Sequence, residues 1–169
     1  MLTMLEKDDW KIALEDARVR HGSVVNLICF TDSQAVNLLR LYVTIASASA
    51  AGAITSFASN ISALPLAVGW GLAVATLAFV TASYFCFLAM TPASINLPGR
   101  DAEFWLWAMR SDVERTEVFK AYLTNLKEKT ELNNSVNLSG SKHLTHAKQI
   151  GMAAPIFALV VGCVAAWMA

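Results

Sequence analysis

Three hydroxyl side chains recur at helical spacing inside an uncharged stretch of the sequence. Thr44, Ser47 and Thr55 belong to a series with intervals of three, four, four and four residues, which places its members on one face of a helix. Hydroxyl oxygens are weak ligands for hydrated ions, and they also form hydrogen bonds between packed membrane helices. The series therefore predicts the lining of a pore or a helix-packing surface, and a ring of subunits could use both. Its members, which we call the hydroxyl stripe, are Thr44, Ser47, Ala51, Thr55 and Ser59.

A second set of small residues follows in the next apolar stretch. Gly69 and Ala73 form one small-xxx-small pair, and Gly71 and Ala75 form another. In lipid there is little hydrophobic force between helices, so small residues favour association by allowing backbones to approach closely. We expect these four residues to pack helix against helix, within one subunit or between subunits.

Basic residues near the start of the chain share a helical face. Lys11 follows Lys7 by four residues, and Arg18 follows Lys11 by seven. A stripe of this kind commonly meets anionic lipid headgroups or solvent. The alternative is an anion site formed when several subunits bring their stripes together, which could hold the phosphates of a nucleotide or oligonucleotide.

Other candidates for chemistry are sparse. His143 and His146 could share a helical face, but no acid or thiol lies near them in the sequence to complete a metal site. Cys29, Cys86 and Cys163 have no metal-ligand or redox spacing. No phosphate loop, nucleophile elbow or zinc-protease motif is present. We therefore expect no enzyme, cofactor or metal, and the net charge of zero gives no reason to expect duplex nucleic-acid binding.

The elements that carry these residues are predicted from the distribution of charge. All 13 Lys and Arg residues fall in two stretches, and residues 41–99 and 150–169 contain no charged side chain. Apolar residues make up 56% of the 169 residues, and the mean hydropathy is +0.47. Soluble helices need a wet face, so runs of this length indicate lipid as the solvent. The sequence predicts an all-α integral membrane protein with three transmembrane helices, at about 41–59, 66–90 and 150–169, and cytosolic amphipathic helices.

Four segments and a topology follow. They are a cytosolic N-terminal helical segment (1–38), a transmembrane hairpin (39–91), a cytosolic helical loop (92–149) and the third transmembrane helix (150–169). Apart from Arg40 at the start of the hairpin, Lys and Arg are confined to the first and third segments, so the positive-inside rule predicts a cytoplasmic N-terminus and a C-terminus outside.

Local signals divide the polar segments further. His21-Gly22 is typical of a helix end, and Thr31 with Gln34 three residues later has the form of a capping box that starts the next helix. Residues 101–132 have the pattern of one long amphipathic helix, and Asn133 to Ser141, with Gly140, is expected to be a break.

This layout of amphipathic N-terminal helix, tight membrane hairpin and long cytosolic helix resembles the small membrane effectors of bacterial antiphage systems, including SLATT-type domains. The resemblance is one of architecture. It implies assembly under the control of a cytosolic signal, followed by perforation or depolarisation of the bacterial inner membrane.

Two functions remain open at this stage. The first is a homo-oligomeric pore or ion channel, because three spans of this size cannot enclose a channel alone, gated by a nucleotide or oligonucleotide that binds the cytosolic segments. The second is a non-conducting membrane anchor or scaffold whose cytosolic helices dock a partner protein. Both have the lipid bilayer as a partner.

Overall fold

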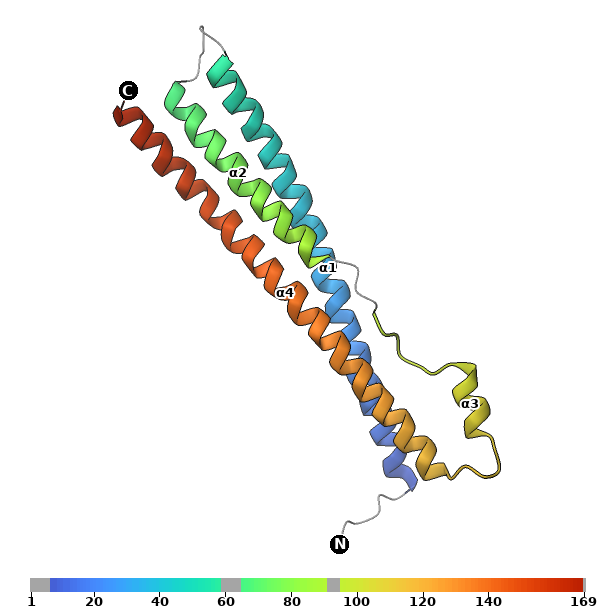
Figure 1. Ribbon diagram of the computed structural model, residues 1–169. Helices are drawn as coiled ribbons and strands as arrows, with labels where there is room; N and C mark the ends of the chain where they lie inside the picture. The colour runs from blue at the N-terminus through green and yellow to red at the C-terminus, as the bar shows by residue number, and fades with distance from the viewer. Residues whose placement is uncertain (1–6, 59–64, 91–94, 169) are drawn as a thin grey trace. The chain divides into compact units, whose positions relative to one another are not determined.

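The described part of the protein is entirely helical. In the computed structural model, residues 7–58, 65–90 and 95–168 are described, and they form the helices α1 (Lys7–Ala58), α2 (Leu66–Ala89), α3 (Ala102–Ala108) and α4 (Arg115–Met168) (Figure 1). No strand occurs in these ranges. α1, α2 and α4 are each long and apolar enough to cross a membrane. This confirms the all-α class with three helices of membrane-spanning length.

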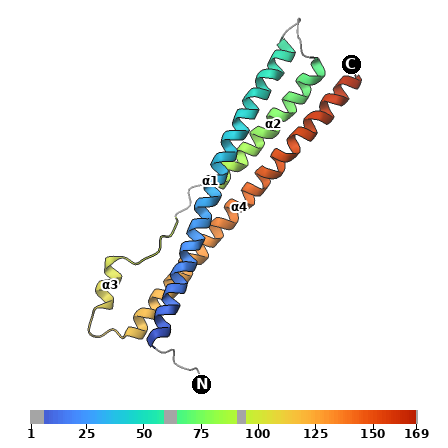
Figure 2. The same cartoon turned by 180° about the vertical axis from the view of Figure 1, so that it is seen from behind.

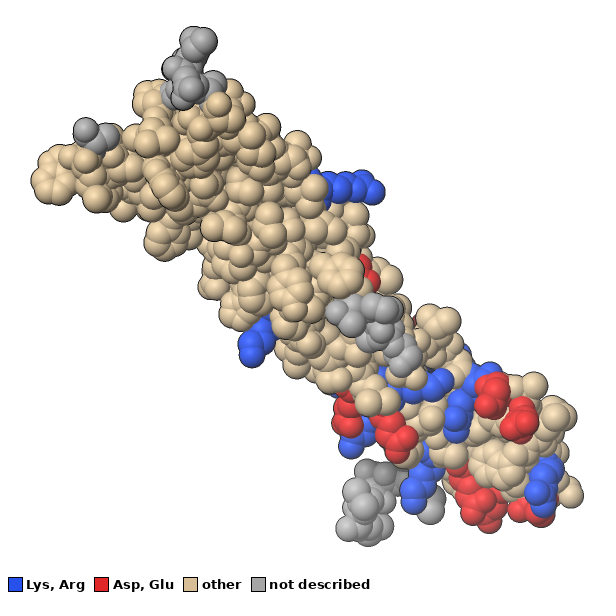
Figure 3. All heavy atoms as spheres, turned by 45° about the horizontal axis from the view of Figure 1, so that its top comes forward, with Lys and Arg blue, Asp and Glu red and all other residues tan. Residues whose placement is uncertain are grey.

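The chain divides into two compact units of different composition. One, the polar unit, contains residues 1–30 and 92–138, and the other, the apolar unit, contains residues 31–91 and 139–169. The polar unit has 10 Lys and Arg residues and 12 Asp and Glu residues, whereas the apolar unit has 3 Lys and Arg residues and 1 Asp. On the face seen in Figure 3 the charged side chains accordingly gather over the polar unit. α1 and α4 each contribute to both units.

The apolar unit is a bundle of three helical segments. The second half of α1, all of α2 and the second half of α4 lie side by side in both ribbon views (Figures 1 and 2). Tyr42 and Phe79 pack in its core with ring centres 5.7 Å apart, next to the fully buried Cys86. The rest of the core is small, because its other buried members are Ala46, Ala75, Ala82, Ala147 and Ala154. Small side chains let the three backbones approach closely.

Two glycines of α4 illustrate this closeness. A Cβ atom added at Gly140 would lie 3.1 Å from the carbonyl oxygen of Ala89, and one added at Gly151 would collide with the ring and hydroxyl of Tyr42. Glycine is used at these two positions for space, because both lie in ordinary helical backbone. The region with Gly140, predicted as a break, is therefore a contact surface of a continuous helix.

The polar unit has a separate core that is aromatic. Phe104 of α3 packs against Tyr122 and Leu126 of α4, and Leu14 of α1 joins this cluster. Asp101 begins α3 as its N-cap, since its side chain accepts a hydrogen bond of 2.9 Å from the backbone N–H of Phe104. An amphipathic segment in this part of the chain is thus present, although it is shorter than the sequence pattern predicted.

The expected helix boundaries in α1 were wrong. α1 runs without interruption through His21, Gly22 and Thr31. One glycine in a helix costs only about 1 kcal/mol, which tertiary contacts easily offset. Thr31 is buried in the interior of α1, and Gln34 accepts a hydrogen bond from Lys148 in α4, so the two residues form no capping box at a helix start.

The expected boundaries in α4 were wrong as well. The predicted helix over residues 101–132 is two helices, separated by a turn in which Nε and Nη2 of Arg110 donate to the Asp112 carboxylate at 3.1 and 2.8 Å. The predicted break over residues 133–141 lies inside α4. Asn133 and Gly140, the residues that predicted this break, form tertiary contacts and not a turn.

Candidate functional site

The hydroxyl stripe lies on an exposed side of α1. Thr44, Ser47, Ala51 and Thr55 are all exposed, and Ser59 is outside the described residues. The buried residues of this part of α1 form a second series at intervals of three and four. They are Tyr42, Ala46, Ser49, Ala53 and Ser56. At about 100° per residue the two series point to opposite sides of the helix, so α2 and α4 pack against the side away from the stripe.

The hydroxyl protons of the stripe are used within α1. Thr44 donates to the carbonyl oxygen of Arg40 at 2.9 Å, Ser47 to that of Val43 at 2.8 Å, and Thr55 to that of Ala51 at 2.9 Å. This bond removes the cost of placing a hydroxyl proton in lipid. A hydroxyl that donates in this way still has oxygen lone pairs, so the stripe presents acceptors on its outer side.

The other exposed surfaces of the apolar unit are different in kind. On α2 and α4 most of the exposed side chains are bulky, as in Leu77 (69% exposed), Leu159 (70%) and Met152 (77%). In the most apolar stretch of 18 residues in α4, only 6% of the residues are buried. Large aliphatic side chains are the type that lipid contacts favour. The stripe is therefore the exposed surface of the apolar unit that least resembles a lipid-facing one.

The polar character of this side of α1 extends beyond the stripe. Arg40 lies one turn before Thr44, and Asn37 and Ser33 precede it at intervals of three and four residues; all three are exposed. A cation therefore lies on the same side of the helix as the first hydroxyl. The spacing of these three residues continues the series of the hydroxyl stripe, although they were not predicted as part of it.

The small residues of α2 face both of its neighbours. Gly69, Gly71 and Ala75 are buried, and Ala73 is partly buried. A Cβ at Gly69 would lie 2.6 Å from the hydroxyl oxygen of Ser56 in α1, and a Cβ at Gly71 would lie 2.8 Å from the carbonyl oxygen of Ala158 in α4. Gly69 and Gly71, the first members of the two small-xxx-small pairs, thus face different helices of the same chain.

The predicted basic stripe is only partly described. The side chain of Lys7 lies outside the described part, and Lys11 and Arg18 are exposed. Arg18 donates from Nε to the hydroxyl of Tyr122 at 3.0 Å, and its guanidinium carbon lies 5.3 Å from the centre of that ring. Arg115, which the sequence analysis did not single out, stands over the ring of Phe119 at 5.8 Å. No signal in the sequence relates Arg115 to Arg18, since 97 residues separate them.

Sequence reasoning also missed a buried polar cluster in the polar unit. His21 and Asn133 are fully buried. The two ring nitrogens of His21 lie 2.9 Å from the Thr130 hydroxyl and 2.8 Å from the Asn96 carbonyl oxygen. The Asn133 amide binds the backbone of Asn96 through its oxygen and its nitrogen, each at 2.9 Å. These contacts hold the segment before α3 against α1 and α4, and the fit explains why His21 and Asn133 do not end helices.

The histidine pair occupies an aromatic environment. The ring of Phe85 lies 6.3 Å from that of His143 and 5.6 Å from that of His146, measured between centres. Within the described ranges, no group of three or more His, Cys, Asp or Glu side chains is placed to hold a metal ion.

Comparisons with known proteins add no relative. Neither a protein family, nor a curated protein, nor a solved structure matches this chain.

Proposed function

We propose that this chain forms a homo-oligomeric pore in a bacterial inner membrane, with the hydroxyl stripe of α1 facing the lumen or the adjoining copy. The observation that carries the proposal is the contrast between exposed surfaces. Thr44, Ser47 and Thr55 are exposed opposite the buried side of α1, whereas most of the exposed residues in the apolar stretches of α2 and α4 are large and apolar. Acceptor oxygens and small side chains suit a wet lumen or a close helix contact better than lipid.

The orientation and the signal belong to the same proposal. The positive-inside rule supports a cytoplasmic polar unit and a C-terminus outside, because 10 of the 13 Lys and Arg residues lie in that unit. A cytosolic signal would then act on the polar unit. The resemblance to antiphage membrane effectors supports a role in bacterial defence, in which opening the pore depolarises the membrane. A nucleotide or oligonucleotide held by Lys7, Lys11 and Arg18 of several copies is the signal that the spacing of these basic residues favours.

A non-conducting anchor is the second candidate function. It is favoured by the exposed apolar side chains of the polar unit, among them Leu106 (65%) and Met109 (72%), which a partner protein could cover. In that case the hydroxyl stripe would serve only as a contact between copies or with the partner's membrane helix.

Ion flux through liposomes that contain the purified protein separates the two functions. The test variant is Ser47→Leu/Thr55→Leu, which replaces two stripe hydroxyls by bulky apolar groups. The matched control is Thr81→Leu on α2. Thr81 is also exposed and also donates to the carbonyl oxygen four residues earlier, at 2.8 Å. The control therefore removes the same kind of group from a surface that the proposal assigns to lipid.

A pore lined by the stripe predicts flux in the wild type and in Thr81→Leu and its loss in the double variant, with the oligomer still intact by size. If the double variant conducts as well as the wild type, α1 does not line the pore. If no variant conducts, with or without cyclic and linear nucleotides, the anchor becomes the better reading.

A further inference from the structure

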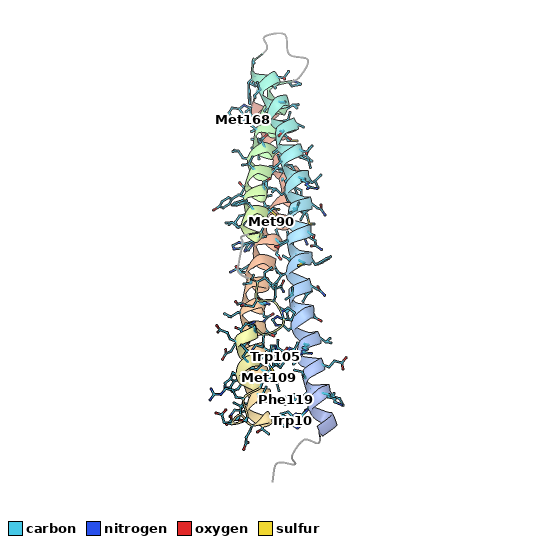
Figure 4. All side chains as sticks on the ribbon, turned by 90° about the vertical axis from the view of Figure 1, so that its right-hand side faces the viewer. Trp10, Met90, Trp105, Met109, Phe119 and Met168 are labelled. Atoms are coloured by element: carbon cyan, nitrogen blue, oxygen red, sulfur yellow. The ribbon has the colours of Figure 1, made fainter. Side chains whose placement is uncertain are left out.

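The polar unit contains a half-open cavity of about 360 Å³. It is formed between α1, α3, the turn after α3 and the first turns of α4, and Trp105, Met109 and Phe119 gather around it (Figure 4). Eight of its ten lining residues are apolar or aromatic, and the other two are Arg18 and Arg115. A concave apolar surface with a few convergent polar groups is the usual form of a small-molecule site.

The two arginines give the cavity its charge. Arg18 uses Nε for the hydroxyl of Tyr122, which fixes the guanidinium at the wall and leaves its two terminal nitrogens to donate elsewhere. Arg115 is positioned by the face of Phe119. Among the side chains that the structure describes, no carboxylate forms an ion pair with either guanidinium. Two guanidinium groups without an acid partner at one cavity favour an anionic ligand.

The rest of the lining limits what that ligand can be. At the ~30 Å³ that one water molecule occupies in the liquid, the cavity holds roughly a dozen non-hydrogen atoms. Leu14, Val113 and Val118 offer no side-chain hydrogen bonds, and the Tyr122 hydroxyl is already engaged by Arg18. Beyond the two arginines and the indole N–H of Trp105, the side chains of the lining offer few partners to the polar edges of a nucleobase or a ribose, and each polar group buried without a partner costs about 1–3 kcal/mol. The body of the ligand must therefore be apolar.

We propose that this cavity binds a small organic anion, with an aromatic or aliphatic body and a single carboxylate or phosphate group held by Arg18 and Arg115. The apolar body lies against Trp105, Phe119 and Val118. Such a ligand differs from the nucleotide signal discussed above, because it uses one charge and a hydrophobic surface. Control of the pore by this ligand rests on the proposed function, whereas binding of the ligand to the cavity does not.

Binding is measured on the full chain in nanodiscs of zwitterionic phosphatidylcholine, so that no anionic lipid competes. The probe is naphthalene-2-carboxylate, and naphthalene-2-carboxamide has the same shape without the charge. Equilibrium dialysis against empty nanodiscs gives the bound amount. The variants are Arg18→Gln and Arg115→Gln, with Arg20→Gln as the matched control, because Arg20 is also exposed on α1 but does not line the cavity.

The proposal predicts that the wild type and Arg20→Gln bind the carboxylate, and that either cavity variant loses affinity by roughly tenfold or more, as for one charge-assisted hydrogen bond. Ala108→Leu, which fills the cavity without removing a charge, must also weaken binding. Equal binding of carboxylate and carboxamide would overturn the proposal. Three other results would overturn it too. They are carboxylate binding no greater than to empty nanodiscs, tighter binding of adenosine monophosphate than of the carboxylate, and a loss of carboxylate affinity in Arg20→Gln equal to that in the cavity variants.

A parallel flux measurement keeps the two proposals separate. If the carboxylate binds but does not change ion flux, the binding site stands and its control of the pore is refuted. If flux occurs but the carboxylate does not bind, the pore stands and the cavity proposal is refuted.

Discussion

Replacing Gly71 by alanine tests whether α2 and α4 approach as closely as their backbones indicate. The added Cβ would lie 2.8 Å from the carbonyl oxygen of Ala158, whereas ordinary contacts begin at 3.4 Å, so the shortfall is 0.6 Å. A backbone carbonyl cannot rotate away, and the two helices must separate. Overpacking of this kind costs about 1–3 kcal/mol, and the gain in helix propensity from glycine to alanine returns at most about 1 kcal/mol. We expect a net loss of about 1–2 kcal/mol.

The buried thiol of Cys86 provides the assay. Cys29 and Cys163 are exposed and would be replaced by alanine, which leaves Cys86, fully buried in the core of the apolar unit, as the one thiol. Pulsed maleimide labelling during a titration with SDS then reports opening of the bundle. Gly71→Ala should raise the open population about 5- to 30-fold at a given SDS concentration.

Gly162→Ala is the matched control on the facing helix. A Cβ there would meet the nearest atom, the carbonyl oxygen of Ala67, at 3.5 Å, which is ordinary contact. This variant should label no faster than the parent protein. If Gly71→Ala also labels at the parent rate, the close α2–α4 approach is refuted.

Two further predictions concern polar residues. Asn133→Ala should destabilise the polar unit by about 2–3 kcal/mol, because it leaves backbone groups of Asn96 without their amide partner. The control Asn96→Ala keeps those backbone groups, so it should destabilise the unit much less. Thermal unfolding followed by circular dichroism measures both losses, and equal losses would contradict this reasoning. Burial raises the pKa of Asp32 above its ordinary value of 3.8. The folded state therefore disfavours the carboxylate, and stability is lost as pH rises from that value through the raised one. Asp32→Asn should accordingly stabilise the protein at pH 7 and lose this advantage below pH 3.8; an advantage that did not depend on pH would refute the assignment.

The membrane-length helices were predictable because their signal is a property of whole segments. The absence of charge over residues 41–99 and 150–169 does not depend on any single contact. The hydroxyl stripe was visible for a related reason, since helical periodicity fixes which residues share a side of a helix. Whether that side faces the other helices of the chain depends on tertiary packing, and the structure was needed to find Tyr42 and Ala46 on the opposite side.

The helix boundaries could not be predicted because single residues were read as local signals. Asn133 and Gly140 are typical of breaks, but the first is satisfied by the backbone of Asn96 and the second allows contact with Ala89. Both partners are distant in sequence. The cavity was invisible for the same reason, since Arg18 and Arg115 meet only through the folding of α1 and α4.

The bonds around His21 have a consequence for protons. The Asn96 carbonyl only accepts, so the ring nitrogen beside it must carry a hydrogen. The Thr130 hydroxyl lies 2.9 Å from the other ring nitrogen and 2.7 Å from the carbonyl oxygen of Leu126, and it has one proton to donate to either of them. The hydrogen bond between α1 and α4 at this buried point is thus coupled to the rotation of one hydroxyl group, with no heavy atom required to move.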